Sequence, residues 1–195
     1  MSMNTEHSQR LQMGKNISLN SSESVVLGRP QAGEQIKISV KKGVIRIGAE
    51  QTETDNACDV TLAFACRADD CEFNYPKELD IRIEAITDTT YFVERINQRD
   101  FKNQDSILDW IIQLHIVRHE TNLENRLMKL FQLLTTRLGK RTSQGLLLDH
   151  TLPHSRIAEM IGSTRSTVSR TISTLRKTKR IYIDELKNQI ILPVD

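Results

Sequence analysis

The stretch from residue 152 to residue 180 constrains this chain more than any other part, because it has the pattern of two short helices joined by a tight turn. Gly162 lies where the turn is expected, since glycine turns the backbone without steric cost. Ser163 or Thr164 follows and is suited to cap the second helix. The first helix has an apolar side formed by Ile157, Ala158 and Ile161.

The second predicted helix separates apolar from polar residues. Val168, Ile172 and Leu175 are spaced at i, i+4 and i+7, so we expect them to face the core. The opposite side is small, polar and basic and consists of Arg165, Ser166, Ser169, Arg170 and Ser173. Residues 151–180 contain seven Lys or Arg and one acidic residue, although the net charge of the chain is only +2. This pattern predicts a helix that binds DNA.

The run IAEMIGSTRSTVSRTISTLR, residues 157–176, resembles the helix-turn-helix of the Crp/Fnr family of bacterial transcription regulators. Within that family the pattern IGSTR-x-TV-x-R is similar to the cyanobacterial nitrogen regulators, and the chain length is similar to that of shortened cyanobacterial Crp-like proteins. The resemblance implies a homodimer that binds double-stranded DNA at a palindromic operator. RNA polymerase or another regulator is a further partner that the resemblance suggests.

The resemblance also assigns roles to single residues. It places Arg165, Ser166 and Arg170 at base-contacting positions. The positions that contact phosphates in the family are occupied by His154, Ser155, Thr164, Thr167 and Ser169. Many relatives carry a glutamate that accepts from cytosine where this chain has Ser166, and a serine is too short for that contact. We therefore expect a half-site of the GTA…TAC type rather than the TGTGA type.

Short runs of β-forming residues precede the helices, between residue 25 and about residue 96. They are residues 25–27, 36–40, 44–47, 60–64, 81–86 and 90–93. Several alternate apolar with polar residues, and turn residues separate them, so an antiparallel sandwich or barrel is expected. Their order is similar to the jelly roll that forms the sensor domain of Crp/Fnr proteins. The predicted fold class is therefore α+β, with an N-terminal antiparallel β-sandwich, a dimerisation helix and a C-terminal winged helix-turn-helix.

The segment CEFNYPKELDIRIEAIT, residues 71–87, departs from the Crp/Fnr pattern. Members that bind a cyclic nucleotide carry FGE, a short helix and an arginine here, because backbone donors and a guanidinium hold the phosphate. Arg82 has no Gly-Glu loop to face, and residues 52–94 contain eleven acidic residues against three basic ones. That charge repels an anionic effector. We expect no cyclic nucleotide and no cofactor.

Two groups of metal-binding residue types are present. Cys58, Cys66 and Cys71 lie within 14 residues, but no C-x2-C pair occurs and only three thiolates are available. His115 and His119 have the i, i+4 spacing of helical metal ligands, but they occur among apolar residues without a third ligand. We expect no metal site. A regulator that senses redox state or holds an iron–sulfur cluster through the cysteines stays open as an alternative.

The segment from residue 105 to residue 119 predicts a helix that is apolar on nearly every side. One face can pack on the sandwich, and the rest is best buried against the same helix of a second copy. The residues expected in this interface are Ile107, Leu108, Ile111, Leu114 and Ile116. A core helix within one domain is the alternative. The next helix, after Glu120, has a leucine stripe and ends at Gly139.

The expected organisation has four parts. Residues 1–24 form a mobile arm, residues 25–98 the sandwich, residues 99–120 the dimerisation helix and residues 121–195 the winged helix-turn-helix. No signal peptide or long apolar run is present, so a cytoplasmic protein without membrane contact is expected. No catalytic motif occurs, and a recombinase that carries a helix-turn-helix needs a catalytic domain that the short strands do not supply. An interaction protein whose degenerate sensor domain binds a protein partner is the remaining alternative.

Overall fold

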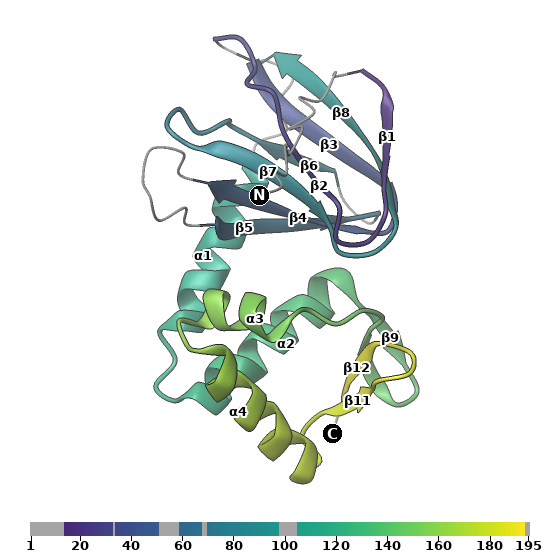
Figure 1. Ribbon diagram of the computed structural model, residues 1–195, viewed down its shortest axis with the longest axis vertical. Coiled ribbons are helices and arrows are strands. Elements are labelled where there is room, and N and C mark those ends of the chain that lie inside the picture. The colour runs from purple at the N-terminus through teal and green to yellow at the C-terminus, as the bar shows by residue number, and fades with distance from the viewer. Residues whose placement is uncertain (1–13, 33, 51–58, 68–69, 98–104, 194–195) are drawn as a thin grey trace, which may run out of the picture. The chain divides into compact units, whose positions relative to one another are not determined.

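The computed structural model describes residues 14–32, 34–50, 59–67, 70–97 and 105–193. The chain divides into two compact units, Met1–Ile107 and Leu108–Asp195, and each is described by itself (Figure 1). Cys58 lies outside the described residues.

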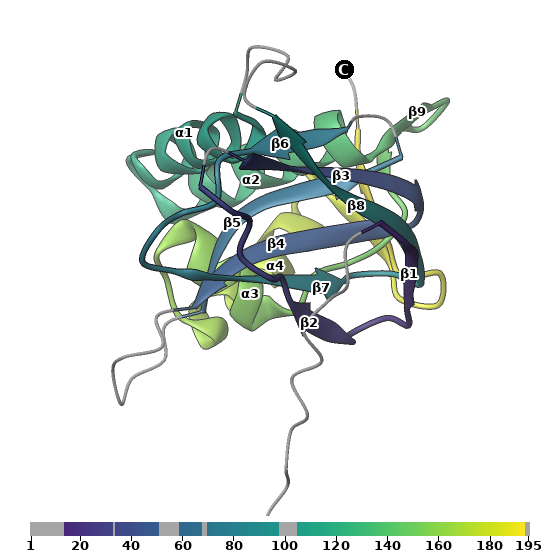
Figure 2. The same cartoon turned by 90° about the horizontal axis from the view of Figure 1, so that it is seen from above.

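The first unit contains two antiparallel four-stranded sheets that face one another (Figure 2). One sheet has the order β1 (Asn16–Leu19), β8 (Thr89–Asn97), β3 (Glu34–Lys42) and β6 (Cys71–Phe73). The other has the order β2 (Ser24–Val26), β7 (Asp80–Ala85), β4 (Val44–Glu50) and β5 (Asp59–Cys66). Apart from β4 and β5, the neighbours in each sheet are distant in sequence, as in a jelly roll. The predicted β-sandwich is confirmed.

The core of this sandwich follows from alternating sequence patterns. In β7, Ile81, Ile83 and Ala85 are buried while the residues between them are half-buried. The facing sheet contributes the buried residues Ile36, Ile38, Val40, Tyr91 and Val93. Because successive side chains of a strand point to opposite faces, alternate residues of each sheet meet between the two layers. Burial of each large apolar side chain contributes about 1.5–3 kcal/mol.

Strand β4 contains a buried charged residue, Arg46, whose burial the sequence does not predict. The side chain of Arg46 is fully buried, and its Nε donates to Thr61 Oγ1 at 2.8 Å. The guanidinium also donates to Glu84 Oε2 at 3.0 Å and to Asp59 Oδ1 at 2.5 Å. A Cβ at position 48 would lie 2.8 Å from Arg46 Nη1, so Gly48 makes room for the side chain. Two carboxylates thus compensate the buried positive charge. Removal of either one would leave that charge only partly compensated and would destabilise the fold.

The beginning of the sandwich differs from the mobile arm that we expected over residues 1–24. Within the described part of that segment, Asn16–Leu19 forms β1 and pairs with β8, with Ile17 opposite Tyr91. Polar and apolar residues alternate here, so a half-buried edge strand forms once a partner strand is available. The expectation missed this because a four-residue strand carries little periodic signal.

The second unit contains most of α1 (Ser106–Arg118), together with α2 (Leu123–Leu138), α3 (His154–Ile161) and α4 (Arg165–Lys177). A small antiparallel sheet accompanies the helices, with the order β11 (Tyr182–Asp184), β12 (Gln189–Leu192), β10 (Gly145–Leu148) and β9 (Lys140–Thr142). The hairpin β11–β12 is the expected wing. In the described part of the chain, no helix is both long and apolar enough to cross a membrane.

Helix α2 provides the apolar surface on which the rest of this unit packs, which agrees with its leucine stripe. The side chain of Asn122 caps it by accepting from the backbone N of Asn125 at 2.8 Å, and the helix ends before Gly139. Its buried residues are Leu127, Leu130, Phe131, Leu134 and Thr135. They pack against α3, α4 and β10. The two helices that follow are therefore held on one apolar surface.

His150 makes the stability of this unit sensitive to pH. Its side chain is buried, and desolvation lowers its pKa, although a hydrogen bond with Asp149 acts in the opposite direction. The unfolded chain therefore binds this proton more tightly than the folded chain. We expect the free energy of unfolding to fall as pH decreases below 6.5, the ordinary pKa of the residue, towards the lowered folded value.

Denaturant unfolding of the wild type and His150→Gln between pH 5 and pH 8 tests this prediction. The difference in stability between the two proteins should change in favour of the variant as pH falls. A difference that stays constant over this range would show that His150 is not titrating in the transition.

Candidate nucleic-acid interface

The predicted helix-turn-helix is formed by α3 and α4. Gly162 ends α3 with φ 65° and ψ 53°, the left-handed conformation that favours glycine. The backbone N of Ser163 donates to Ala158 O at 2.9 Å and closes the turn. Thr164 then caps α4, since its side chain accepts from the backbone N of Thr167 at 3.2 Å. The turn and the cap therefore lie where the sequence predicts them.

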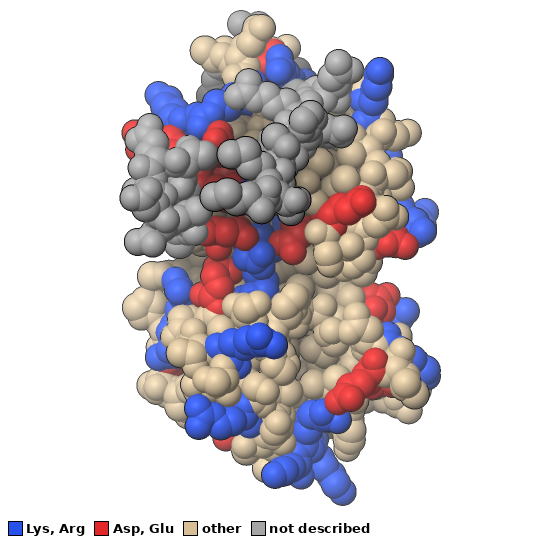
Figure 3. Space-filling view, viewed as in Figure 1, with Lys and Arg blue, Asp and Glu red and all other residues tan. Residues whose placement is uncertain are grey.

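Helix α4 also has the predicted division of faces. Val168, Ile172 and Leu175 are buried, as are Ile157, Ala158 and Ile161 of α3. The opposite face of α4 carries the exposed residues Arg165, Ser166, Arg170 and Ser173. Figure 3 shows Lys and Arg side chains gathered at the end of this unit where α4 lies. The unit thus presents a basic helix on a rigid apolar base.

The three positions predicted to contact bases are all exposed on the first half of α4. The Nε of Arg170 makes a long contact, 3.4 Å, with the backbone oxygen of Ser166, one turn earlier. Arg165 makes no hydrogen bond or ion pair with another described residue. Its guanidinium is therefore available for a bidentate contact with a guanine edge.

The positions predicted to contact phosphates lie around the two helix starts. Thr164 and Thr167 share a hydrogen bond between their hydroxyls at 2.8 Å, so capping of α4 orients both side chains. Ser155 is exposed in the first turn of α3, whereas His154 and Ser169 are half-buried. Hydroxyls and backbone donors at helix starts are ordinary phosphate ligands.

A groove between α4 and the wing was not predicted from the sequence. It has a volume of about 310 Å³ and is lined on its polar side by Thr151, His154, Ser169, Ser173, Arg176 and Asn188. At one end Arg176 Nη1 lies 2.8 Å from Glu185 Oε1, which joins α4 to the wing. Thr151 Oγ1 donates to Asn188 Oδ1 beside the wing turn. With Phe131 of α2, the lining comes from four separate segments, so only the fold brings them together.

Helix α1 exposes an apolar surface. Leu108, Ile112 and Ile116 follow one another every fourth residue and are 57%, 48% and 49% exposed, and Ile111 beside them is 39% exposed. We call these four residues the α1 stripe. Two residues predicted for the dimer interface, Ile107 and Leu114, are instead buried on the opposite side of the helix. Packing within one chain therefore already covers these two side chains.

The two cysteines that the structure describes give little support for a redox site. Burial raises the pKa of Cys71 to about 12, against a smaller opposite effect of a hydrogen bond with Ser106, so its reactive thiolate is scarce at neutral pH. Cys66 is half-buried and, like Cys71, is not in a disulfide. Over the described residues, no three His, Cys, Asp or Glu side chains come together as metal ligands.

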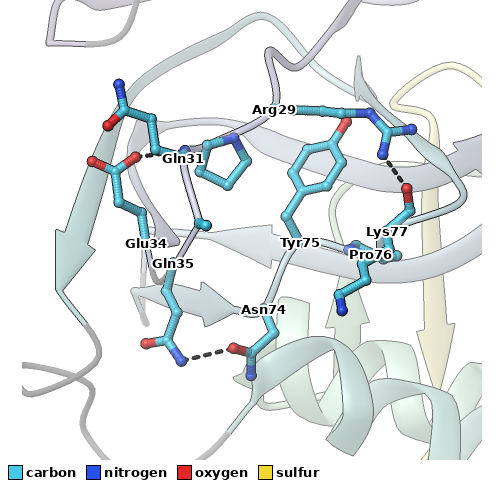
Figure 4. A pocket seen from close by; sticks show the side chains of 10 residues that line it. Arg29, Gln31, Glu34, Gln35, Asn74, Tyr75, Pro76 and Lys77 are labelled. Carbon is cyan, nitrogen blue, oxygen red and sulfur yellow. Dashed lines mark hydrogen bonds between the residues drawn. The ribbon is translucent and has the colours of Figure 1, made fainter.

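The first unit contains an open pocket of about 710 Å³ between the segment before β3 and the segment between β6 and β7 (Figure 4). Arg29 lies over the ring of Tyr75, and its guanidinium donates to the carbonyls of Lys77 and Leu79 and to the Asp80 carboxylate. Gln35 Nε2 donates to Asn74 Oδ1 at 2.8 Å. These polar groups are engaged with one another, so the pocket offers no ready cradle for a phosphate.

The helices and the hairpin of the second unit define its class of domain. A three-helix core with α3 and α4 as a helix-turn-helix, followed by a β-hairpin wing, is a winged helix-turn-helix domain.

Comparison with known proteins gives the family of this domain. Residues 125–193 match the family described as the Crp-like helix-turn-helix domain. A putative HTH-type transcriptional regulator of Porphyra purpurea is 35% identical over 79 residues, which cover 40% of this chain and 32% of the relative. The global nitrogen regulator of Nostoc is 34% identical over 88 residues, 45% of this chain and 39% of that protein. The matches thus span only 32% to 39% of the length of these curated relatives.

Solved structures extend the comparison to both units. A CRP-family transcriptional regulator of Thermus thermophilus covers 93% of this chain, and 92% of its own, with 17% identity and a TM-score of 0.61. FixK2 of Bradyrhizobium japonicum covers 91% of both chains, with 17% identity and a TM-score of 0.63. The resemblance to Crp/Fnr regulators is thereby confirmed: the chain has their fold and carries a Crp-like helix-turn-helix domain.

Proposed function

We propose that the protein is a cytoplasmic transcription regulator that binds a palindromic operator as a homodimer, with no enzymatic activity of its own. The observation that carries this proposal is the outer face of α4, where Arg165, Ser166 and Arg170 are exposed above a buried Val168 and Ile172. A rigid helix with short hydroxyls and two arginines fits the major groove. Phosphate contacts by His154, Ser155, Thr164, Thr167 and Ser169 would fix its orientation.

The homodimer is supported by the α1 stripe. An exposed surface of one leucine and three isoleucines is unfavourable in water, and a second copy of the same helix is its simplest cover. A two-fold axis would then set two α4 helices about one DNA turn apart, roughly 34 Å. We therefore revise the seam to Leu108, Ile111, Ile112 and Ile116.

Binding without a cyclic nucleotide is supported by the arginines of the first unit. Arg82 donates to Glu50 Oε2 at 2.7 Å and to Ser24 Oγ at 3.0 Å, and Arg29 donates to Leu79 O at 3.1 Å in the segment between β6 and β7. Neither guanidinium is left to hold a phosphate, and the loop between β6 and β7 has no Gly-Glu sequence.

Selection of bound sites from random DNA tests the proposal directly. We expect an imperfect palindrome whose half-sites contain a conserved guanine. Enrichment of no sequence, or of a site without two-fold symmetry, would contradict it.

Salt dependence tests the electrostatic part of the same proposal. Because basic side chains displace counterions from phosphates, the logarithm of the association constant should fall linearly with that of the salt concentration. For six or more phosphate contacts the loss is about 10³-fold or greater between roughly 50 and 200 mM salt. Titration of the selected operator by fluorescence anisotropy measures this slope. A binding constant independent of salt over the range would rule out a phosphate-based interface.

A further inference from the structure

His115 and His119 lie close together on the exposed side of α1. Their Nε2 atoms are 3.1 Å apart, and their rings meet edge to face with centroids 4.4 Å apart. His119 follows the last residue of the helix, but its backbone N still donates to His115 O at 3.2 Å, so the helical turn continues through it. When two imidazole nitrogens share one hydrogen bond, one of them is the acceptor, and its lone pair points towards the other ring.

The separation of the two nitrogens is close to that of a metal chelate. Zn–N bonds of about 2.0–2.1 Å at a tetrahedral angle place two ligand nitrogens roughly 3.3–3.4 Å apart. The observed 3.1 Å needs only a small rotation of the two side chains to reach this value. The i, i+4 spacing is the one by which a helix supplies two histidines to one zinc ion. The pair is therefore arranged to hold a borderline divalent cation.

One chain supplies too few ligands for such an ion. In the part of the chain that the structure describes, no third His, Cys, Asp or Glu joins the pair. A structural zinc site has four protein ligands. The remaining ligands must come from water or from another copy.

The position of the pair on α1 points to the second copy. Ile111, His115 and His119 form a row at i, i+4 and i+8 that runs beside the row of Leu108, Ile112 and Ile116. The two histidines thus lie at the C-terminal end of the exposed face of α1 that we assign to the dimer seam. The shared site requires a dimer in which the two α1 helices run in the same direction. Each histidine pair then meets its equivalent, whereas antiparallel helices would place it opposite Leu108.

We propose that His115 and His119 of two protomers together bind one divalent cation of the zinc class at the end of the dimer seam. This site rests on the homodimer of the proposed function. The C-terminal end of a helix favours positive charge, and α1 ends at Arg118. The Arg118 guanidinium donates to Glu159 O at 3.1 Å within its own unit and does not compete for the site. Ile112 and Ile116 exclude water on one side and strengthen the ligation.

Zinc and cobalt binding to the full chain test the proposal. We expect one Zn²⁺ for two chains, and visible absorption of tetrahedral Co²⁺ without the thiolate charge-transfer bands that cysteine ligands produce. His115→Gln with His119→Gln should lose this ion, whereas Cys66→Ser should retain it. Both histidines are exposed, so the double variant should keep the fold, which circular dichroism checks.

Sedimentation with and without zinc gives a second readout. Because an ion that binds only the dimer stabilises it, saturating zinc should tighten the dissociation constant of the wild-type dimer at least about tenfold. The double glutamine variant should dimerise to the same extent with and without zinc.

The outcomes separate the two proposals. A wild-type dimer that binds no zinc overturns the metal site and leaves the dimer intact. One zinc ion per chain with an unchanged dimer constant shows that the pair acts within one protomer, which also overturns the shared site. A protein that is monomeric with and without zinc contradicts the homodimer itself, and the shared site fails with it.

Discussion

Replacing Leu108 and Ile112 by aspartate is expected to convert the protein to monomers that no longer bind palindromic DNA tightly. Both side chains are about half exposed in one chain, so the change should not unfold it. In a dimer through the α1 stripe, four carboxylates would be buried without partners, and each costs several kcal/mol. The dimer should weaken by more than about 10³-fold, since each 1.4 kcal/mol is a factor of ten.

Analytical ultracentrifugation at micromolar concentration measures the monomer fraction, and anisotropy compares a palindrome with an isolated half-site. Gln132→Asp with Thr136→Asp is a matched control, because these residues are exposed at the same i, i+4 spacing on α2. The control should remain dimeric. A double aspartate variant of the stripe that dimerises and binds the palindrome normally would place the seam elsewhere.

Arg165→Ala should weaken binding to the best operator by roughly 1–3 kcal/mol and remove the preference at one base pair of each half-site. Arg165 is exposed at the start of α4, and its side chain makes no hydrogen bond or ion pair with another described residue that would have to break first. A guanidinium that donates twice to one guanine discriminates that base from the other three. Ser166, one residue later, is too short to impose a cytosine preference. It should therefore not replace the base preference that is lost with Arg165.

Binding-site selection on the wild type and the variant compares the base preferences position by position. Thr167→Ala is the matched control, because we propose a phosphate contact for this residue, whose hydroxyl is oriented by Thr164. It should weaken all sequences alike and leave the preferences unchanged. If Arg165→Ala selects the same bases as the wild type, Arg165 is not the residue that recognises this base pair.

The helix-turn-helix was predictable because its signals are local. The spacing of Val168, Ile172 and Leu175 fixes the buried side of α4, and the conformational freedom of Gly162 fixes the turn. Most strands were also indicated by short alternating runs. The three-residue strands β6 and β9 and the edge strand β1 were missed, because each is short and has at most two apolar residues, which is too few for an apolar run or a sustained alternation.

Tertiary structure alone decided the features that depend on distant segments. Helix α1 is apolar on nearly every side, so its sequence could not show that Ile107 and Leu114 face inwards while Leu108 and Ile112 remain exposed. The ion pairs of Arg46 join three strands, and the groove beside α4 is lined from four segments. The sequence by itself therefore determined most of the elements, the cap of α4 and its exposed polar face, because these follow from neighbours within a turn or two. The burial of one side of α1 and of Arg46 was decided by packing, because only the folded chain shows which surfaces are already covered.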